Sequence, residues 1–501
     1  MKFTLSWLKE HLETEASVEE VADTLNRIGL EVEEIINPAG SLDGFVVGEI
    51  KEHGKHPDAD KLSLLTVTTG DEDFQVVCGA PNCRKGLKGI FAKAGLVIPA
   101  YNDVLKPAKI RGMDSCGMMC SEKELCLGDD HSGIIELADD AVVGMPAEQV
   151  INVDPVFDIS ITPNRAECLG VRGIARDLAA AGLGKVKDLK ISSINKTVDS
   201  PIDVKVENFK SCPVYTGRYI KGVNNRAETP KWMKDRLVAI GLRPISALVD
   251  ITNYVNYDLA RPSHAFDADK LKGDVVVRMA KDGEKFVSLE EKEYALDDQS
   301  LGICDDEGIQ CLGGIMGGAN KGITLETTNM FLECALFDAG MIARTGRKFG
   351  IESDSRYRYE RWVDPKSNVL GSNYITSLIL EICGGEASDI IVCGNEGDFK
   401  NAVAYITPSH YEKLIGMPVE AAKIKEILGN LGFEVSEEGD KIKAVSPTWR
   451  GDIEGEHDLI EEVVRMVGLD NVPAKSMIEG GKWLKPTLNM IQKREIGRAH
   501  V

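Results

Sequence analysis

VFDISI, residues 156–161, TPNR, residues 162–165, and VRGIARDLAAAGL, residues 171–183, decide how the first part of the chain is interpreted. The first run predicts a strand, and the Pro-Asn pair in the second predicts a turn. The third run predicts a helix, because its apolar residues recur at helical spacing. A strand, a turn and a helix in this order indicate a mixed α/β unit.

The sequence before this unit changes character near residue 40. Residues 1–37 predict helices that end at Gly29, since apolar side chains recur there at helical spacing: Leu5, Leu8, Leu12, Val18, Val21, Leu25 and Ile28. Residues 40–150 instead hold short β-rich runs separated by Gly, Pro, Asn and Asp, which predict a small closed barrel: FVVGEI, LSLLTVTTG, FQVVCGA and GIFAKAGLVIP. We therefore expect a barrel inserted into an N-terminal α/β unit made of residues 1–39 and 151–195.

Two further domains are expected after residue 200, because 501 residues are too many for one core. Residues 200–398 alternate strand and helix signals and contain several Gly pairs, which predicts a larger α/β domain. Residues 400–475 predict a small α+β domain, with helices at 409–414 and 419–431 and strands at FEVSEE and KIKAVSP. An acidic helix from Glu456 to Val467 follows. The fold class is therefore multidomain α/β and α+β.

The tail, residues 476–501, shows no closing core pattern. One admissible codon choice for Ile496 to Val501, ATC GGA AGA GCA CAC GTC, resembles a common sequencing-library adapter. Our hypothesis is that the reading frame leaves native sequence after about Arg494 or Glu495, so this segment is partly artefactual. Resequencing the locus tests it, because a natural stop codon directly after Val501 in intact DNA would refute it.

The sequence composition indicates the cellular compartment of the protein and the redox state of its cysteines. No stretch reaches the roughly 20 uncharged apolar residues that span a bilayer, and the amphipathic start MKFTLSWLKEHL lacks signal-peptide features. We therefore expect a cytoplasmic protein without a membrane partner. The 12 cysteines are scattered, which favours reduced thiols, and Cys116, Cys120 and Cys126 do not have a common zinc spacing. Buried or inert thiols are favoured over a metal at these three positions.

The formal net charge of -21 argues against a polyanion partner, but the local charge differs. Residues 84–111 contain one acid, Asp103, and seven bases: Arg84, Lys85, Lys88, Lys93, Lys106, Lys109 and Arg111. A basic face on an acidic protein can bind RNA, with Phe91 and Tyr101 as candidate stacking side chains. Charge alone favours the alternative, an ordinary solvated face.

Four motifs in the predicted barrel resemble the OB-fold tRNA-binding domain of a known family. They are HPDADKL (56–62), VVCGAPN (76–82), KIRGMDSCGMMCSEKEL (109–125) and GDDHSGIIEL (128–137). Related domains also occur alone or fused to other synthetases, so these motifs by themselves identify a tRNA-binding module. The resemblance implies that the seven bases contact tRNA through its shape and backbone.

Five further motifs resemble, in the same order, the β subunit of bacterial phenylalanine–tRNA ligase. They are FDISITPNRAECLGVRGIARDLAA (157–180), LVDITNYVNYDLARPSHAFDADKL (248–271), GGIMGG (313–318), SDSRYRYERWVDP (353–365) and PTWRGDIEGEHDLIEEVVRMVGLDNVP (447–473). The resemblance covers the chain up to about residue 475. It implies an editing domain at 200–398 and a B5-like, winged-helix-like domain at 400–475. It also implies an α2β2 aminoacyl-tRNA ligase in which the α subunit uses ATP to activate phenylalanine, and tRNA(Phe) as a partner.

The resemblance implies that the middle domain hydrolyses mischarged Tyr-tRNA(Phe), because an apolar pocket rejects an added hydroxyl only about 100-fold. Positions that match the editing motifs are Thr252, Asn253, Pro262, His264, Gly317, Gly318 and Glu333. Ser355 is also expected at the substrate, where the family often has a small residue such as alanine. His264 would orient a water or the terminal ribose. Glu333 would accept a hydrogen bond from a tyrosine phenol, whereas the alternative is an ion pair with Arg356 or Arg361.

An acidic cluster lies near the end of the resemblance. Six carboxylates and one base lie between Arg450 and Glu462, and such a cluster repels itself unless a cation sits within it. The resemblance implies a Mg²⁺ site shared with the α subunit, with these ligands: Asp452, Asp458, Glu461 and Glu462. The alternative is a solvated acidic helix.

Two other functions stay open. One is a free-standing tRNA-binding protein, and the other is an autonomous trans-editing hydrolase that needs no partner. The 447–473 motif favours the ligase subunit, because a metal site shared with an α subunit makes sense only in a heteromeric enzyme.

Overall fold

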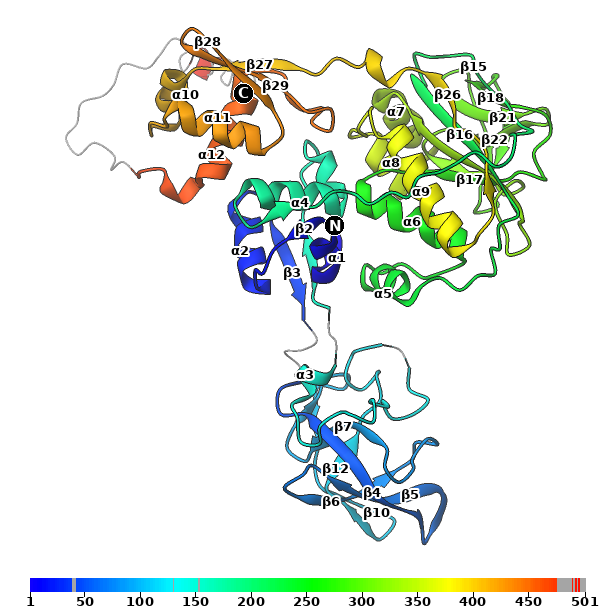
Figure 1. Cartoon of the computed structure of the whole chain (residues 1–501), viewed down its shortest axis with the longest axis vertical. Helices are drawn as coiled ribbons and strands as arrows, with labels where there is room; N and C mark the ends of the chain where they lie inside the picture. The colour runs from blue at the N-terminus through cyan, green and yellow to red at the C-terminus, as the bar shows by residue number, and fades with distance from the viewer. Residues whose placement is uncertain are drawn as a thin grey trace.

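A computed structural model describes residues 1–37, 42–128, 130–151 and 154–474, together with residues 489, 492, 494 and 495 (Figure 1). The predictions for residues 476–501 therefore lie almost wholly outside the described residues. Among the helices that the structure describes, none combines the length and the apolar character that crossing a bilayer requires.

The N-terminal unit is a three-stranded antiparallel sheet with helices packed against it. The strand predicted at 156–161 is β13, and it lies between two strands from the start of the chain in the order β1-β13-β3. The bounds are β1 Lys2–Thr4, α1 Leu5–His11, β2 Leu12–Glu13, α2 Val18–Arg27, β3 Val32–Ile36, β13 Val156–Ile159, η2 Ala166–Leu169, α4 Val171–Ala180 and β14 Lys185–Val186. The helices are confirmed, and the strands β1, β2, β3 and β14 are additional to the prediction.

The barrel is a curled five-stranded sheet in the order β12-β7-β4-β5-β6. Its edge strands approach each other, since Cys116 N donates to Gln75 O at 2.9 Å, next to β12 and within β6. The bounds are β4 Val46–His56, β5 Ala59–Thr68, β6 Asp73–Cys78, β7 Lys88–Lys93, β8 Val97–Ile98, β9 Asp103–Val104, β10 Ala108–Ile110, β11 Met113–Ser115, β12 Gly117–Met119 and α3 Ala147–Val150. The β-rich segment therefore forms a nearly closed barrel.

The central region contains two facing five-stranded sheets, in the orders β15-β18-β21-β22-β23 and β17-β24-β16-β25, with β26 also paired to β16. Its strands are β15 Val204–Val206, β16 Val214–Lys221, β17 His264–Asp267, β18 Val275–Met279, β19 Lys285–Val287, β20 Glu293–Ala295, β21 Leu301–Asp305, β22 Gly308–Leu312, β23 Met316–Gly317, β24 Asn329–Leu336, β25 Glu386–Ala387 and β26 Ile391–Gly394. Its helices are α5 Lys231–Ala239, α6 Ala247–Leu259, α7 Ala339–Phe349, α8 Asp354–Tyr359 and α9 Asn368–Ile382, followed by η3 Glu396–Asp398. One apolar core fills the space between the sheets.

The last described region is a three-stranded sheet, β27-β29-β28, covered by helices. The bounds are β27 Val403–Ile406, α10 Pro408–Ile415, α11 Ala421–Asn430, β28 Glu434–Glu438, β29 Lys441–Val445, α12 Glu456–Val467 and η4 Leu469–Asn471. Three helices and two strands are as predicted, and the edge strand β27 is additional.

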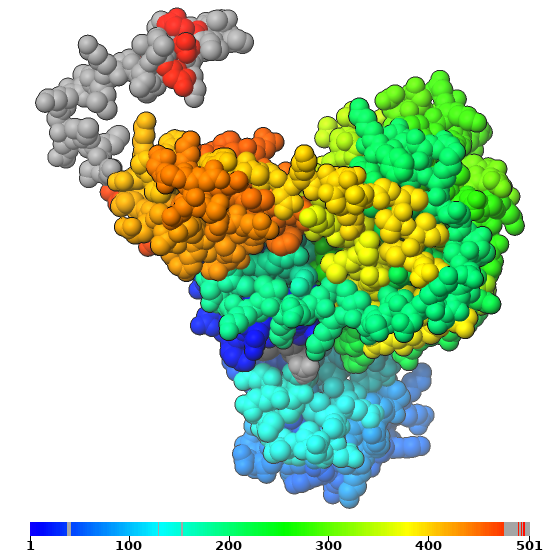
Figure 2. Space-filling view, turned by 45° about the horizontal axis from the view of Figure 1, so that its top comes forward, coloured from blue at the N-terminus to red at the C-terminus, as the bar shows by residue number. Residues whose placement is uncertain are grey.

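The cores show how these parts are joined. One continuous core runs from the N-terminal unit through α6 and α9 to α11 and α12, so three regions share buried side chains. The barrel has two small cores of its own and forms a separate lobe, blue and cyan in Figure 2. The multidomain α/β and α+β fold class is confirmed.

Candidate functional site

His264 and Glu333 lie directly opposite each other on neighbouring strands. β17 pairs antiparallel with β24, and the register places His264 against Glu333. Directly opposed residues project from the same face of a sheet, which here faces the core between the two sheets. Gly317 of the facing sheet packs against the imidazole, because a Cβ added there would lie 2.6 Å from His264 Cε1. Three predicted editing residues therefore meet at one place between the sheets.

Glu333 is a buried acid whose partner is a tyrosine. Its side chain is almost inaccessible, and Tyr215 Oη donates a hydrogen bond of 3.1 Å to Glu333 Oε2. Burial raises the pKa of Glu333 to about 8, and the Tyr215 hydrogen bond and the Arg261 charge act in the opposite direction. Glu333 is therefore largely protonated at neutral pH.

The alternative that Glu333 forms an ion pair with Arg356 or Arg361 is wrong. Arg356 donates to Glu360 Oε2 at 3.0 Å and to Ile351 O at 2.6 Å. Arg361 donates to Glu360 and to the Tyr357 carbonyl. Both guanidinium groups belong to a separate cluster around Glu360.

His264 is a neutral imidazole at physiological pH. Burial lowers its pKa to about 4, because its surroundings do not solvate the protonated ring. The ring packs edge-on against Phe266, with centroids 4.4 Å apart. Such a ring keeps one nitrogen as an acceptor and one as a donor, which suits the orientation of a water or a hydroxyl.

The remaining predicted editing residues lie on α6, on the segment before β17, directly after β23 and on α8. The Pro262 carbonyl accepts a 3.4 Å bond from Tyr359 Oη, and Ser355 Oγ donates to Gly314 O at 3.1 Å. Gly318 has no room for a side chain, since a Cβ would lie 2.4 Å from Gln310 O. Thr252 and Asn253 lie on α6, which leads into β17 through residues 260–263, and Thr252 Oγ1 donates to the Val249 carbonyl at 2.9 Å within the helix.

Sequence reasoning missed Arg261, which shapes the path from α6 to His264. Its side chain is fully buried and donates to the Ala335 carbonyl, to Asn368 Oδ1 at 2.6 Å and to Ser367 Oγ at 3.3 Å. The preceding Ala260 adopts a left-handed φ of 54°, which turns the chain out of α6. The arginine within ARPSH was the available signal.

The basic surface of the barrel is less basic than its local sequence indicates. Glu136 forms a double hydrogen bond with Arg84, at 2.8 and 2.6 Å, and Glu72 accepts from Lys93 at 2.9 Å. Both acids lie outside residues 84–111, so the local charge count did not include them. The exposed bases in the window are Arg84, Lys85, Lys106, Lys109 and Arg111.

The two candidate stacking side chains differ. Phe91 is fully buried in the barrel core, so its prediction as a stacking residue is wrong. Tyr101 is 56% exposed. A cavity of about 420 Å³ opens beside Lys106, and Ser121, Glu124 and His131 contribute its polar lining. The cavity size suits a small organic group.

Two of the four acids predicted to hold magnesium, Asp452 and Glu462, are paired with arginines. Arg450 Nη1 and Nη2 donate to the two carboxylate oxygens of Glu462 at 2.7 and 2.9 Å, and Arg465 Nε donates to Glu462 Oε1 at 3.0 Å. Arg450 also donates to both oxygens of Asp452, at 2.8 and 2.7 Å. Burial opposes the charge of Glu462, but Arg465 and Arg450 outweigh it and hold the pKa of Glu462 well below its usual range.

These contacts decide how the four carboxylates fit a metal. Asp458 Oδ2 accepts the backbone N–H groups of Glu454 and Gly455 at 2.8 and 2.9 Å, which caps α12, and Glu461 is exposed. Among the described residues, the four acids do not bring their oxygens together as one group of ligands. Arginines therefore neutralise Asp452 and Glu462, and backbone N–H groups bind Asp458, so these three acids need no cation to be stable here. The four acids do not form a complete magnesium site within the described part of this chain, and the site shared with an α subunit stays a prediction.

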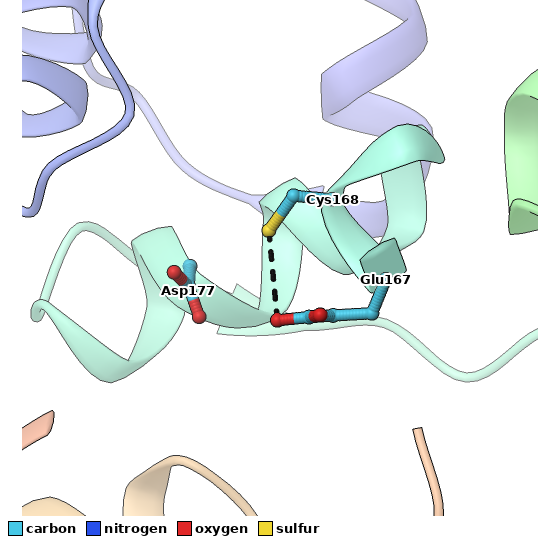
Figure 3. Close-up of side chains that lie close together, drawn as sticks. All are labelled: Glu167, Cys168 and Asp177. Atoms are coloured by element: carbon cyan, nitrogen blue, oxygen red, sulfur yellow. Dashed lines mark hydrogen bonds between the residues drawn. The ribbon is translucent and has the colours of Figure 1, made fainter. Parts of the chain in front are cut away.

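A second acidic group belongs to the same charge network. Glu167, Cys168 and Asp177 bring ligand atoms within 4.8 Å of one another (Figure 3). Arg165 holds both carboxylates, at 2.8 Å from Glu167 and 2.6 Å from Asp177. Arg465 reaches Asp177 at 3.0 Å. Arginine charges therefore take the place that a metal would occupy, and the network links α4 to α12.

The three regions match three known domain families. The family models are the putative tRNA binding domain at residues 45–146, the B3/4 domain at 211–384 and the tRNA synthetase B5 domain at 405–469. His264 and Glu333 lie within the second match, and the arginine-paired acids lie within the third.

Curated relatives extend the match over nearly the whole chain. A phenylalanine–tRNA ligase β subunit of Paramagnetospirillum magneticum is 50% identical over 99% of this chain and 62% of its own length. The corresponding subunits of Rhodospirillum rubrum and Rhodopseudomonas palustris are 52% and 47% identical, over 95% and 99% of this chain and 60% and 62% of theirs. The chain thus spans about three fifths of the length of the curated relatives that it matches. With the three domains in the same order, the chain belongs to the phenylalanine–tRNA ligase β subunit family.

Proposed function

We propose that this chain acts in a phenylalanine–tRNA ligase, binding tRNA(Phe) and hydrolysing mischarged Tyr-tRNA(Phe). The observation that carries the editing role is the pair of half-buried His264 and buried Glu333, opposed on β17 and β24 within the B3/4 match. A buried carboxyl held between sheets is costly, and a site that hydrogen-bonds a substrate hydroxyl makes use of it. In this proposal phenylalanine is attached to tRNA by the complex with an α subunit, which binds ATP.

The chemistry follows from the two side chains. A tyrosine phenol that reaches Glu333 forms a hydrogen bond, whereas phenylalanine leaves the carboxyl without that partner. His264, neutral at physiological pH, orients the attacking water or the terminal ribose. Gly317 leaves room for the His264 ring, and Gly318 allows the close approach of the Gln310 carbonyl. The other proposed contacts are Thr252, Asn253, Pro262 and Ser355.

Glu333→Ala tests the editing proposal in the complex of full-length β and α subunits. We expect hydrolysis of Tyr-tRNA(Phe) at pH 9, where Glu333 is ionised, to slow by about 100-fold, as for loss of a charged hydrogen bond of about 3 kcal/mol. Deacylation of an unrelated aminoacyl ester should change little. Glu293→Ala, at an exposed position of β20 in the same domain, is the matched control. Equal slowing of both substrates by Glu333→Ala would reject a tyrosine-reading site.

The proposed partners are tRNA(Phe) and the α subunit, in an α2β2 assembly in the cytoplasm. A magnesium ion shared with the α subunit, which the family resemblance implies, would be held here by the exposed Glu461 and by Asp458, whose Oδ1 lies 3.4 Å from His457 Nε2, since Asp452 and Glu462 are held by arginines. Co-purification with an α subunit separates this proposal from a free-standing tRNA-binding or trans-editing protein.

A further inference from the structure

Tyr215 and Glu333 form a buried polar pair in an otherwise apolar core. β16 and β24 are antiparallel, with Tyr215 opposite Ala335 and Gly217 opposite Glu333. Tyr215 and Glu333 are therefore diagonal neighbours on one face of the sheet. Gly217, directly opposite Glu333, has no side chain, and a Cβ there would lie 2.4 Å from Phe331 Cζ. The Phe331 ring occupies the space that a side chain at position 217 would need.

The hydrogen bond gives the two oxygens of Glu333 different roles. Oε2 accepts from Tyr215 Oη at 3.1 Å, so Oε1 is the oxygen that an incoming group can use. Both side chains are almost wholly buried, and a hydrogen bond made in a low-dielectric core fixes orientation strongly. We propose that Tyr215 is a positioning residue that presents Glu333 Oε1 to the substrate phenol. This inference rests on the proposed editing function.

The effect of Tyr215 on the ionisation of Glu333 differs from that of the other groups around this carboxyl. Arg261 is the nearby charge that favours the carboxylate, and His264 opposite is neutral at physiological pH. The remaining titratable neighbours have pKa values that burial raises, so they stay protonated and uncharged: Cys212, Cys311, Cys334 and Tyr359. Because the Tyr215 bond lowers the pKa of Glu333 from what burial alone would give, removing the phenol hydroxyl raises that pKa further.

In this proposal, Glu333 recognises the substrate through the phenol of its tyrosine, which is the second phenol to bind the carboxylate. Tyr215 occupies Oε2, and the phenol of a misacylated tyrosine donates to Oε1, so the ionised carboxylate accepts one hydrogen bond on each oxygen. Phenylalanine supplies no donor for Oε1. The ratio of Tyr-tRNA to Phe-tRNA hydrolysis therefore follows the ionised fraction of Glu333.

Tyr215→Phe tests this in the complex of full-length β and α subunits, because it removes one hydroxyl and keeps the ring. The ratio of Tyr-tRNA(Phe) to Phe-tRNA(Phe) hydrolysis is measured in single turnovers between pH 6 and 10. We expect the midpoint of that ratio to rise by about one pH unit or more, which lowers the ratio at pH 7.5 by about tenfold. Tyr219→Phe is the matched control, since Tyr219 lies on the same strand and face, opposite Phe331.

The outcomes separate positioning from a merely structural role. An unmoved midpoint in a folded Tyr215→Phe complex overturns the proposal, as does an equal change in Tyr219→Phe. In a Glu333→Gln background, Tyr215→Phe should add no change to the pH profile, because the amide does not titrate.

A measurement without substrate keeps the test independent of editing. Tyr215→Phe should destabilise the chain more at pH 9 than at pH 6 in urea unfolding, and Glu333→Gln should abolish that difference. If wild type hydrolyses no Tyr-tRNA(Phe), the editing proposal fails, yet the unfolding data still decide whether Tyr215 controls the ionisation of Glu333. A difference that is absent, or that persists in Glu333→Gln, overturns the inference.

Discussion

The protonation of Glu333 makes the stability of the chain depend on pH. The carboxyl titrates near its usual pKa of 4.5 when unfolded and near 8 when folded, because burial disfavours the charge. This group's contribution to stability is therefore fully present below about pH 4.5 and is lost as the pH rises to about 8. Glu333→Gln removes the titration, so its unfolding free energy relative to wild type should improve by a few kcal/mol between pH 5 and 9. Urea unfolding at both pH values measures this, and an unchanged difference would contradict the assigned burial effect.

The functional residues were easier to predict from sequence than the residues that they contact. The motifs indicated His264 and Glu333, and the structure places them opposite each other. The partner of Glu333 could not be found in the same way, because Tyr215 is 118 positions away and meets it only through strand register. Arg356 and Arg361 were plausible by charge, but both donate to Glu360, the residue that follows α8.

The elements with strong periodicity were predictable, and the short ones were not. The acidic helix was expected at Glu456 to Val467, and α12 has those bounds, since its apolar stripe repeats over three turns. β1 and β3 were missed because three to five residues beside helical spacing carry too little alternation to identify a strand. Strand order was also out of reach, because pairing partners such as β16 and β24 are far apart in sequence.

Substitutions in the barrel test whether a base that is paired with an acid contributes less to RNA binding than Lys106 and Lys109. Lys106→Gln and Lys109→Gln should each lower tRNA affinity several-fold and reduce the salt dependence of binding by about one unit of slope, as for loss of one phosphate contact. Arg84→Gln should have a smaller effect, because its guanidinium is already paired with Glu136. Filter binding across a series of salt concentrations measures both quantities. An Arg84→Gln effect as large as that of Lys109→Gln would show that the Glu136 pair does not compete with RNA.

At the scale of the molecule, the inserted barrel could be predicted from sequence, whereas the packing of the other regions against one another could not. The barrel has its own cores, so a change of local composition was enough to predict it as an inserted unit. The association of residues 400–474 with the N-terminal unit was not predictable, because it depends on contacts between residues up to 288 positions apart. The buried charge network, with Asp177 on α4 and Arg465 and Glu462 on α12, is the polar part of that contact.

This network predicts that arginine, rather than a metal ion, stabilises the contact between α4 and α12. Arg465→Met should lower the free energy of unfolding by about 3–5 kcal/mol, because it leaves Asp177 and Glu462 buried with too little positive charge. Lys423→Met, which breaks the exposed pair with Glu426, should stay within about 0.5 kcal/mol. A chelator should leave the unfolding of the wild-type chain unchanged, whereas acid should destabilise it as the pH falls below 4.5, since the pKa of Glu462 is lowered in the folded state. Chemical unfolding with and without chelator distinguishes an arginine from a metal ion as the stabilising cation. A chelator effect as large as that of Arg465→Met would mean that a bound metal ion neutralises the buried acids.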